Sequence, residues 1–375
     1  AVMTQNIGAG RPGVAYQARQ LGLAFNAVLG VIMSLFLSLG AGIILSGVGV
    51  ADALMQPAKT YLQIVGGFCI LNALIPICSS YLRAFGFSKE PLYASIIGNV
   101  INFCLNAFFL FVLHKGVAGV ATATVISRII NLVIVVLLGA VLVKAKQHPE
   151  RESNRAVMGQ IIRIGLPSAC ETAIYNVSMT LVIRFLNQMD AQGLNVTARS
   201  YTMQITNFSY CVGAALAQAN AIMTGWHIGA KEYDACDRGT KKAAVIGVIV
   251  AVILETVFTL CSGWIMQLFS KDPQMVSLVG KLLAIDIVLE IGRVTNLVYG
   301  QALKTSGDAV FPVVMGACFM ILCSVGGTYL FGIRLGLLAV GAYIGMTGDE
   351  CVRAVGMYLR WKSGKWKEKG LVKSR

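Results

Sequence analysis

The fold of this chain is decided by a long uncharged stretch near its beginning. Residues 21–51 read LGLAFNAVLGVIMSLFLSLGAGIILSGVGVA and contain no acidic or basic side chain. A helix of about 20 apolar residues is enough to cross the hydrocarbon core of a bilayer. The chain has 375 residues, of which 56% are hydrophobic and 13% are charged, which is too apolar for a set of soluble domains. The composition therefore predicts an all-α integral membrane protein.

Comparable apolar stretches recur along the chain and predict ten transmembrane helices. The expected spans are 21–48, 61–85, 91–113, 117–143, 164–187, 198–225, 243–269, 277–303, 310–331 and 336–360.

The formal net charge of +14 is explained by where the basic residues lie. When the loops are assigned alternately to the two sides of the membrane, one side holds 21 of the 31 Lys and Arg, the other side holds seven, and Arg128, Arg293 and Arg353 lie within spans. Loops rich in Lys and Arg stay in the cytoplasm. We therefore expect a multi-pass protein of the plasma membrane, with both ends of this chain in the cytoplasm and no nucleic-acid partner.

A glycine-rich loop opens the chain. Residues 7–13 read IGAGRPG and match G-x-G-x-x-G, the pattern of a dinucleotide-binding loop. Such a site needs an acidic residue about 20 positions later, but Met33 lies there, within VIMSLFLSL. Residues 228–234, IGAKEYD, repeat the opening of the loop without its later glycines. A nucleotide site is not expected, and the second occurrence of the IGA motif indicates an internal repeat.

The repeat keeps one register at three loops. Ile228 lies 221 positions after Ile7, and RAFGFSKEP at 83–91 is matched 221 positions later by KTSGDAVFP at 304–312. Gly116 and Gly336 are 220 positions apart. The chain is therefore expected to be two copies of one helical bundle. An even number of helices in each copy predicts a parallel repeat, with both halves in the same orientation.

The second copy has two spans, 164–187 and 198–225, before its IGA loop, and the first copy has none. Two helices are thus expected to precede the chain, which would complete an architecture of twelve helices in two bundles of six. The predicted organisation is an N-terminal bundle at 1–143 holding the last four of six helices, a basic cytoplasmic linker at 144–163, a six-helix C-terminal bundle at 164–360 and a basic cytoplasmic tail at 361–375.

Four motifs make the chain similar to multidrug and toxic compound extrusion (MATE) transporters. They are QNIGAGR at 5–11, RIGLPSACE at 163–171, GWHIGAKEYDA at 225–235 and EIGRVTNLVYGQALKTSGD at 290–308. The resemblance extends over residues 1 to about 360. It implies an exporter of amphipathic, often cationic compounds that is driven by inward flow of Na⁺ or H⁺.

Ionisable side chains inside the spans are candidate site residues, because each costs roughly 2.5–3.5 kcal/mol on insertion. Glu171, Tyr175 and Ser178 share one helical stripe that could line a site for a cationic substrate or a coupling ion. The alternative is an acid stabilised by the dipole at the start of its helix. Many members of the family carry this acid about a turn deeper.

A second group of ionisable residues lies on the span 277–303. Asp286, Glu290 and Arg293 share one face, with Asn296 beside them. They either neutralise one another or form a proton or sodium site, for which Glu290 is the best candidate. The family often has Asp in this helix. A transient Na⁺ is expected at Glu171 or Glu290.

Two further polar stripes are weaker candidates for the binding site. Asn99, Asn102 and Asn106 share one face of their helix, as do Tyr201, Gln204 and Asn207 of theirs. Each stripe is explained equally well by hydrogen bonds between helices and by contact with substrate.

The remaining ionisable residues favour structural roles. Arg128 corresponds to Asp349 in the second copy, and Glu350 and Arg353 adjoin it, which predicts buried ion pairs that lock the bundles. Glu255 has no partner visible in the sequence, so a functional role is not favoured.

Secondary transport by alternating access is the leading functional hypothesis, with Glu171 and Glu290 binding H⁺ or Na⁺ and substrate in turn. A lipid-linked oligosaccharide flippase of the same superfamily is the alternative. An enzyme is not expected, because the three histidines, His114, His148 and His227, lie in or beside predicted loops. We expect no cofactor, no resident metal, a small-molecule substrate and a monomer.

Overall fold

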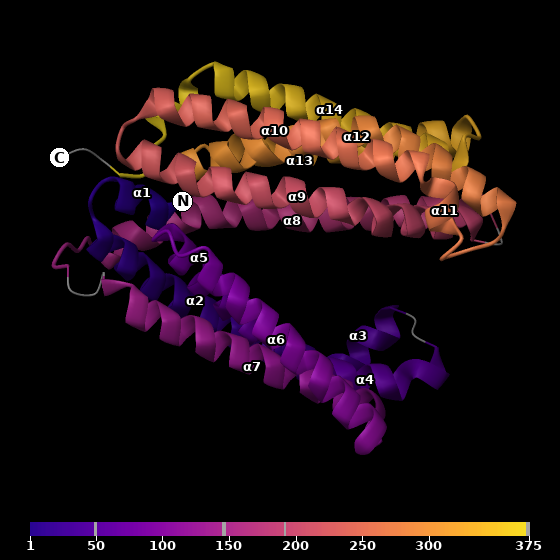
Figure 1. Ribbon diagram of the computed structural model, residues 1–375, viewed down its shortest axis with the longest axis horizontal. Coiled ribbons are helices and arrows are strands. Elements are labelled where there is room, and N and C mark those ends of the chain that lie inside the picture. Colours follow the sequence, from indigo (N-terminus) through magenta and orange to yellow (C-terminus); the bar gives the residue numbers. More distant parts are fainter. Residues whose placement is uncertain (49–50, 145–147, 191–192, 373–375) are drawn as a thin grey trace. The chain divides into compact units, whose positions relative to one another are not determined.

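The computed structural model describes residues 1–48, 51–144, 148–190 and 193–372, and the regular structure in these residues is entirely helical (Figure 1). The chain divides into two compact units. The first unit is Gly10–Gly159, and the second combines Ala1–Ala9 with Gln160–Arg375. The short N-terminal segment therefore belongs with the C-terminal part of the chain, although the sequence assigned it to the first bundle.

The first unit is a bundle in which α2 and α7 both contact α4 and α5, and α7 also contacts α6. At the centre, α2 approaches α5 so closely that a Cβ on Gly30 would lie 2.8 Å from the Cα of Ile70. The backbone N–H of Ile70 donates to the Ser34 hydroxyl at 3.1 Å. The helices are α2 (Pro12–Leu39), α3 (Ala41–Val48), α4 (Asp52–Gly67), α5 (Ile70–Ala84), α6 (Lys89–Ala107), the π-helix η1 (Phe108–Val112) and α7 (Gly116–Leu142).

The second unit is built around α12, which contacts α9, α10 and α14 along its length. Asp272 caps this helix by accepting a hydrogen bond from the Gln274 N–H at 3.0 Å, and Pro273 supplies its first residue. The elements are α1 (Val2–Gly8), α8 (Asn154–Met189, which enters this unit at Gln160), α9 (Leu194–Gly229), α10 (Tyr233–Leu260), α11 (Ser262–Met266), α12 (Pro273–Ser306), α13 (Val310–Phe319), the π-helices η3 (Met320–Val325) and η4 (Thr328–Arg334), α14 (Leu338–Lys362) and the 3-10 helix η5 (Lys365–Glu368).

Five helical segments of the described chain are long and apolar enough to cross a membrane, and a sixth is obtained if α4 and α5, bent by 42° at their junction, form one span. The five are Pro12–Leu39, Lys89–Val112, Gly116–Leu142, Tyr233–Leu260 and Val310–Arg334. The long helices α8, α9, α12 and α14 fall outside this set because polar side chains lower their hydropathy. These four helices carry most of the candidate site.

Helix boundaries differ from the expected ones where polar residues extend a helix beyond its apolar part. The helix α2 begins at Pro12, well before residue 21, and ends at Leu39. Similarly, α8 begins at Asn154, inside the segment 144–163 that was expected to be a linker. Residues 145–147 of that segment lie outside the described residues.

Backbone conformation shows the internal repeat directly. The left-handed residues Gly10 (φ 71°) and Lys231 (φ 62°) follow α1 and α9 and are 221 positions apart. Gly86 (φ 89°) and Gly307 (φ 99°), after α5 and α12, have the same separation. The two copies therefore share their turns as well as their helices.

The third pair of loops has a different register from the expected one. His114 (φ 49°) corresponds to Gly336 (φ 69°), and Gly116 (φ 54°) to Leu338 (φ 52°), both 222 positions apart. Each turn follows a π-helix, η1 in the first copy and η4 in the second. The pairing of Gly116 with Gly336 is therefore wrong by two residues, because each copy places its glycine at a different one of the two left-handed positions.

The C-terminal tail packs against other parts of the second unit, to which it belongs. Trp361 at the end of α14 stacks on Trp366, with ring centroids 4.1 Å apart and planes 8° apart. The backbone N–H of Leu371 donates to the side-chain oxygen of the fully buried Gln5 at 2.8 Å. This segment is the expected basic cytoplasmic tail at 361–375, and its final residues, 373–375, lie outside the described part.

Candidate functional site

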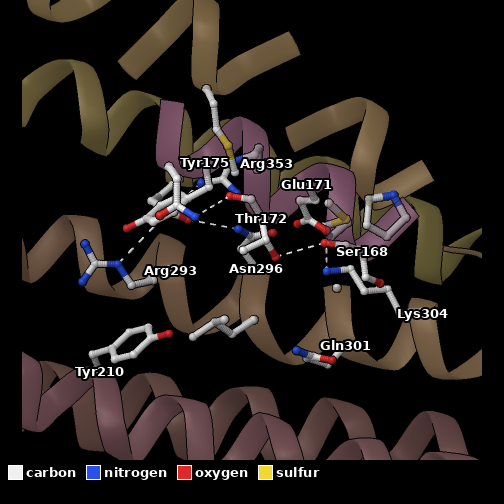
Figure 2. Close-up of a pocket in the computed structure, with 17 residues that line it drawn as sticks. Ser168, Glu171, Thr172, Tyr175, Tyr210, Arg293, Asn296, Gln301, Lys304 and Arg353 are labelled. Atoms are coloured by element: carbon white, nitrogen blue, oxygen red, sulfur yellow. Dashed lines mark hydrogen bonds and ion pairs between the residues drawn. The ribbon is translucent and has the colours of Figure 1, made fainter. Parts of the chain in front are cut away.

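The second unit contains a cavity of about 520 Å³ whose wall comes from α8, α9, α12, α13, η3 and α14 (Figure 2). The apolar part of this wall is formed by Leu297, Gly300, Pro312, Met320 and Met357. The polar residues on the wall are Ser168, Glu171, Thr172, Tyr175, Asn176, Tyr210, Arg293, Asn296, Gln301, Lys304, Glu350 and Arg353.

Helical periodicity explains how these side chains meet. On α8, the lining residues from Ser168 to Asn176 recur at spacings of three and four, which keeps them on one face. On α12, the lining residues from Arg293 to Lys304 follow the same spacing. Each of the two helices thus contributes one polar stripe to the pocket. Glu171 and Tyr175 both line the wall, which is consistent with the expectation that they share a stripe.

An ion pair closes one end of the pocket. The Lys304 Nζ on α12 lies 2.5 Å from the Glu171 Oε2 on α8, and both side chains are less than a fifth exposed. Figure 2 shows this pair on one side of the view and Arg293 on the other. Glu171 therefore already has a cationic partner within the protein.

Glu350 is the centre of a second polar group on the pocket wall. Its Oε2 accepts from the Asn296 amide at 3.0 Å, and its Oε1 lies 2.8 Å from the Arg353 guanidinium. Arg353 also makes two hydrogen bonds, at 2.8 and 3.0 Å, to Asp349. The Nε of Arg293 lies 3.9 Å from Glu350 Oε1. The sequence correctly indicated buried ion pairs at Asp349, Glu350 and Arg353. Arg128, which it grouped with them, forms no ion pair with another described residue.

Three buried carboxylates gather near Arg293, a lining residue of the pocket. Glu255 on α10 meets Asp286 and Glu290 on α12, with one carboxylate oxygen from each residue within 4.8 Å of the others. Each side chain is at most 2% exposed. Arg293 donates a hydrogen bond to Glu290. We call these three acids the carboxylate cluster.

The carboxylate cluster has more acceptors than the described residues satisfy. Both oxygens of Glu255, one of Asp286 and one of Glu290 are buried without a hydrogen-bond partner among the described residues. Three carboxylates face one guanidinium, and buried charge without compensation is strongly unfavourable. The arrangement therefore calls for bound protons or a bound cation.

Glu255 is the residue of this cluster that sequence reasoning undervalued. Its partners lie on another helix, and the contact between α10 and α12 cannot be derived from helical spacing. The available signal was the cost of a lone acid in an apolar run, ILETVF.

Other candidate residues of the second unit lie away from the pocket wall. Ser178 is 1% exposed and belongs to the part of α8 beyond the lining stripe. Tyr201 packs on Phe269, with ring centroids 5.3 Å apart, whereas Gln204 and Asn207 are exposed. Tyr210, three residues after Asn207, is the α9 residue that lines the pocket.

The asparagine stripe of α6 lies in the first unit. The Asn102 amide donates to the Ser127 hydroxyl on α7 at 3.4 Å, and the Asn106 amide donates to the Asn102 carbonyl oxygen at 3.1 Å. Asn99 is exposed. The contacts of Asn102 favour hydrogen bonding between helices, one of the two expected roles.

Similarity to known proteins agrees with this architecture. The MatE family model matches residues 1–108 and 167–330. The uncharacterized transporter YisQ of Bacillus subtilis is 32% identical over 377 residues, covering 99% of this chain and 82% of that protein. The probable multidrug resistance protein NorM of Thermotoga maritima is 22% identical over 362 residues, covering 90% of this chain and 76% of that protein.

Solved structures share the fold. A crystal structure of MATE in the straight conformation superposes with a TM-score of 0.87 at 18% identity, covering 98% of this chain and 83% of that one. An outward-facing multidrug resistance MATE family transporter gives the same TM-score at 17% identity, with the same coverage. A multi-pass helical membrane protein with this family match is a transporter of small molecules and not an enzyme. The chain belongs to the MatE family, the multidrug and toxic compound extrusion transporters that its loops resemble.

Proposed function

We propose that this protein is an antiporter that exports amphipathic, cationic drugs or toxic metabolites in exchange for H⁺ or Na⁺. The observation that carries the proposal is the carboxylate cluster, which holds three acids against one guanidinium, that of the pocket-lining Arg293. A site with excess buried negative charge is suited to binding and releasing small cations.

The coupling cation is assigned to the carboxylate cluster, with Glu255 added to the expected Glu290 and Asp286. Glu171, the other expected Na⁺ position, is neutralised by Lys304 at 2.5 Å. A cation entering there would have to displace an ammonium group that the protein itself supplies. The unpartnered oxygens of the cluster have no such competitor among the described residues.

The substrate is assigned to the pocket. A volume of about 520 Å³ lies within the range of about 300–1,000 Å³ that accommodates drug-sized molecules. Tyr175 and Tyr210 offer aromatic rings to a flat apolar cation, and Glu171 offers a carboxylate. A cationic substrate would take the place of Lys304 at Glu171.

The pocket favours a cationic substrate over the diphosphate of a lipid-linked oligosaccharide. Its basic lining residues are Arg293, Lys304 and Arg353, and each of them is paired with a carboxylate. A diphosphate would need unpaired cations. We further propose that the protein acts as a monomer in the plasma membrane, with both ends of this chain in the cytoplasm.

Efflux of ethidium from loaded cells tests the proposal. The Na⁺ and H⁺ gradients are collapsed separately, and cells carrying the empty vector give the background. Export above background that stops when one gradient is collapsed supports coupled antiport and names the ion. A well-expressed protein that exports no ethidium under any gradient would overturn the proposal and favour the flippase alternative.

A further inference from the structure

We propose that Arg293 couples the carboxylate cluster to the pocket by acting as a tethered cation that is shared between Glu290 and Glu350. This inference rests on the proposed antiport and deepens it. Arg293 binds Glu290 when the cluster holds no external cation. When a cation enters the cluster, the guanidinium moves toward Glu350 on the pocket wall and weakens binding of a cationic substrate.

The position of Arg293 fits this role. It donates to Glu290 in the carboxylate cluster, and it is also a lining residue of the pocket. Among the described residues, no other Lys or Arg forms an ion pair with Glu255, Asp286 or Glu290. Arg293 is therefore the described basic residue that touches both places.

Glu350 is a second partner, which lies at ion-pair distance from Arg293 but is not hydrogen-bonded to it. Its Oε1 lies 3.9 Å from Arg293 Nε, which is too long for a hydrogen bond. Asn296 and Arg353 hold Glu350 in place. A small rotation of the Arg293 side chain, which is 20% exposed, completes the contact without moving a helix.

Arg293 has fewer hydrogen bonds and more exposure than Arg353, the other arginine beside Glu350. Arg353 is fixed by two hydrogen bonds to Asp349 and is 5% exposed. Glu290 is completely buried. Glu290 and Glu350 compete for the guanidinium of Arg293. A change in the charge of either carboxylate therefore shifts the position of the guanidinium.

The sign of the coupling follows from electrostatics. A proton or Na⁺ at the carboxylate cluster cancels negative charge next to Glu290, so Glu290 holds Arg293 less strongly. The guanidinium then pairs with Glu350 and adds positive character to a wall that already carries Lys304 and Arg353. A cationic substrate is repelled, and by linkage a bound substrate weakens cation binding to the same extent.

Ethidium affinity of the purified protein, measured by fluorescence, tests this coupling. The dissociation constant is determined across Na⁺ concentrations at fixed pH and across pH at fixed Na⁺. In the unaltered protein the coupling cation is expected to weaken ethidium binding about tenfold, a common size for allosteric coupling. In Arg293→Gln, ethidium still binds, and the cation changes its affinity by less than about twofold.

Two further variants make the result specific. Arg360→Gln removes the same charge from a residue that pairs with Asp308 at 2.7 Å outside the pocket, and it is expected to keep the tenfold effect. Glu350→Gln removes the second partner while leaving Arg293 and the carboxylate cluster in place, and it is expected to lose the effect even if Arg293→Gln does not fold.

The outcomes separate the coupling from the antiport itself. If Arg293→Gln or Glu350→Gln binds ethidium with the full cation dependence of the unaltered protein, the role of Arg293 is overturned and the antiport stands. If the unaltered protein binds no ethidium, or its affinity responds to neither cation, both the antiport and the coupling are overturned.

Discussion

Lys304 on α12 reaches Glu171 on α8 with 2.5 Å between Nζ and Oε2. The two charges lie on different helices of the second unit and are both mostly buried, so the pair is not screened like an exposed ion pair. Under the proposed function, Lys304 is therefore a competitor for a cationic substrate at Glu171 that the protein itself supplies.

Removing this competitor should tighten substrate binding. In Lys304→Met, Glu171 is left for the ligand, and we expect the ethidium dissociation constant to fall several-fold. In Glu171→Gln, Lys304 remains as an uncompensated cation, and the dissociation constant should rise. Fluorescence titration of the purified variants measures both values. Equal affinities in the two variants would remove this pair from the substrate site.

Neutralising Glu255 should uncouple export while leaving the protein folded. The buried cluster holds more negative charge than Arg293 balances, so Glu255→Gln relieves repulsion and should leave thermal stability unchanged or raised. Ethidium efflux driven by the coupling gradient should fall at least tenfold. Glu232→Gln is the matched control, since the side chain of Glu232 is 59% exposed. Normal coupled efflux by Glu255→Gln would exclude this residue from the ion site.

The sequence predicts the helices and their repeat well, because both depend on local properties. The uncharged run at 21–51 requires a membrane helix whatever its neighbours are. The two IGA loops mark the repeat because equivalent turns need the same left-handed positions, Gly10 and Lys231. Boundaries such as the start of α8 at Asn154 are harder to predict, since polar residues continue a helix beyond its apolar part.

The candidate site could be predicted only as separate stripes. Asp286, Glu290 and Arg293 share a face by helical spacing, and this much is visible in the sequence. The meeting of Glu255 with them, and of Lys304 with Glu171, depends on how one helix rotates against another. Periodicity within a single helix does not contain that information.

Gly307 should be the most sensitive of the left-handed glycines. A Cβ at this position would overlap the carbonyl oxygen of Lys369 in the packed tail, and φ is +99°. A left-handed non-glycine residue costs about 1–2 kcal/mol from its backbone alone, so Gly307→Ala should lose more than this and expose the tail to protease. Gly10→Ala is the control, because nothing lies within 4 Å of its Cβ and the second copy has Lys231 there. Equal thermal stability of the two variants would contradict the argument.

Asp190 should stabilise the start of α9 in a pH-dependent way. Its Oδ1 accepts from the Leu194 N–H at 2.8 Å, and its Oδ2 accepts from the Asn195 N–H at 3.0 Å. Burial raises the pKa of Asp190, but the hydrogen bonds from Asn195 and Leu194 outweigh it and hold the pKa below its ordinary value.

The sign of this dependence can be measured with Asp190→Asn. A lowered pKa in the folded state means that the stabilisation is present above pH ~4, the ordinary pKa of Asp, and is lost as the pH falls through the lowered value. Asp190→Asn should therefore unfold more easily at pH 7, by about 1 kcal/mol as for one lost hydrogen bond, because the amide nitrogen of Asn cannot accept from an N–H group, and the difference should shrink in acid. Thermal unfolding of both proteins in detergent at pH 7 and pH ~3 measures it. A difference that grows on acidification would mean that Asp190 is held in its protonated form and that the hydrogen bonds to α9 do not depend on its charge.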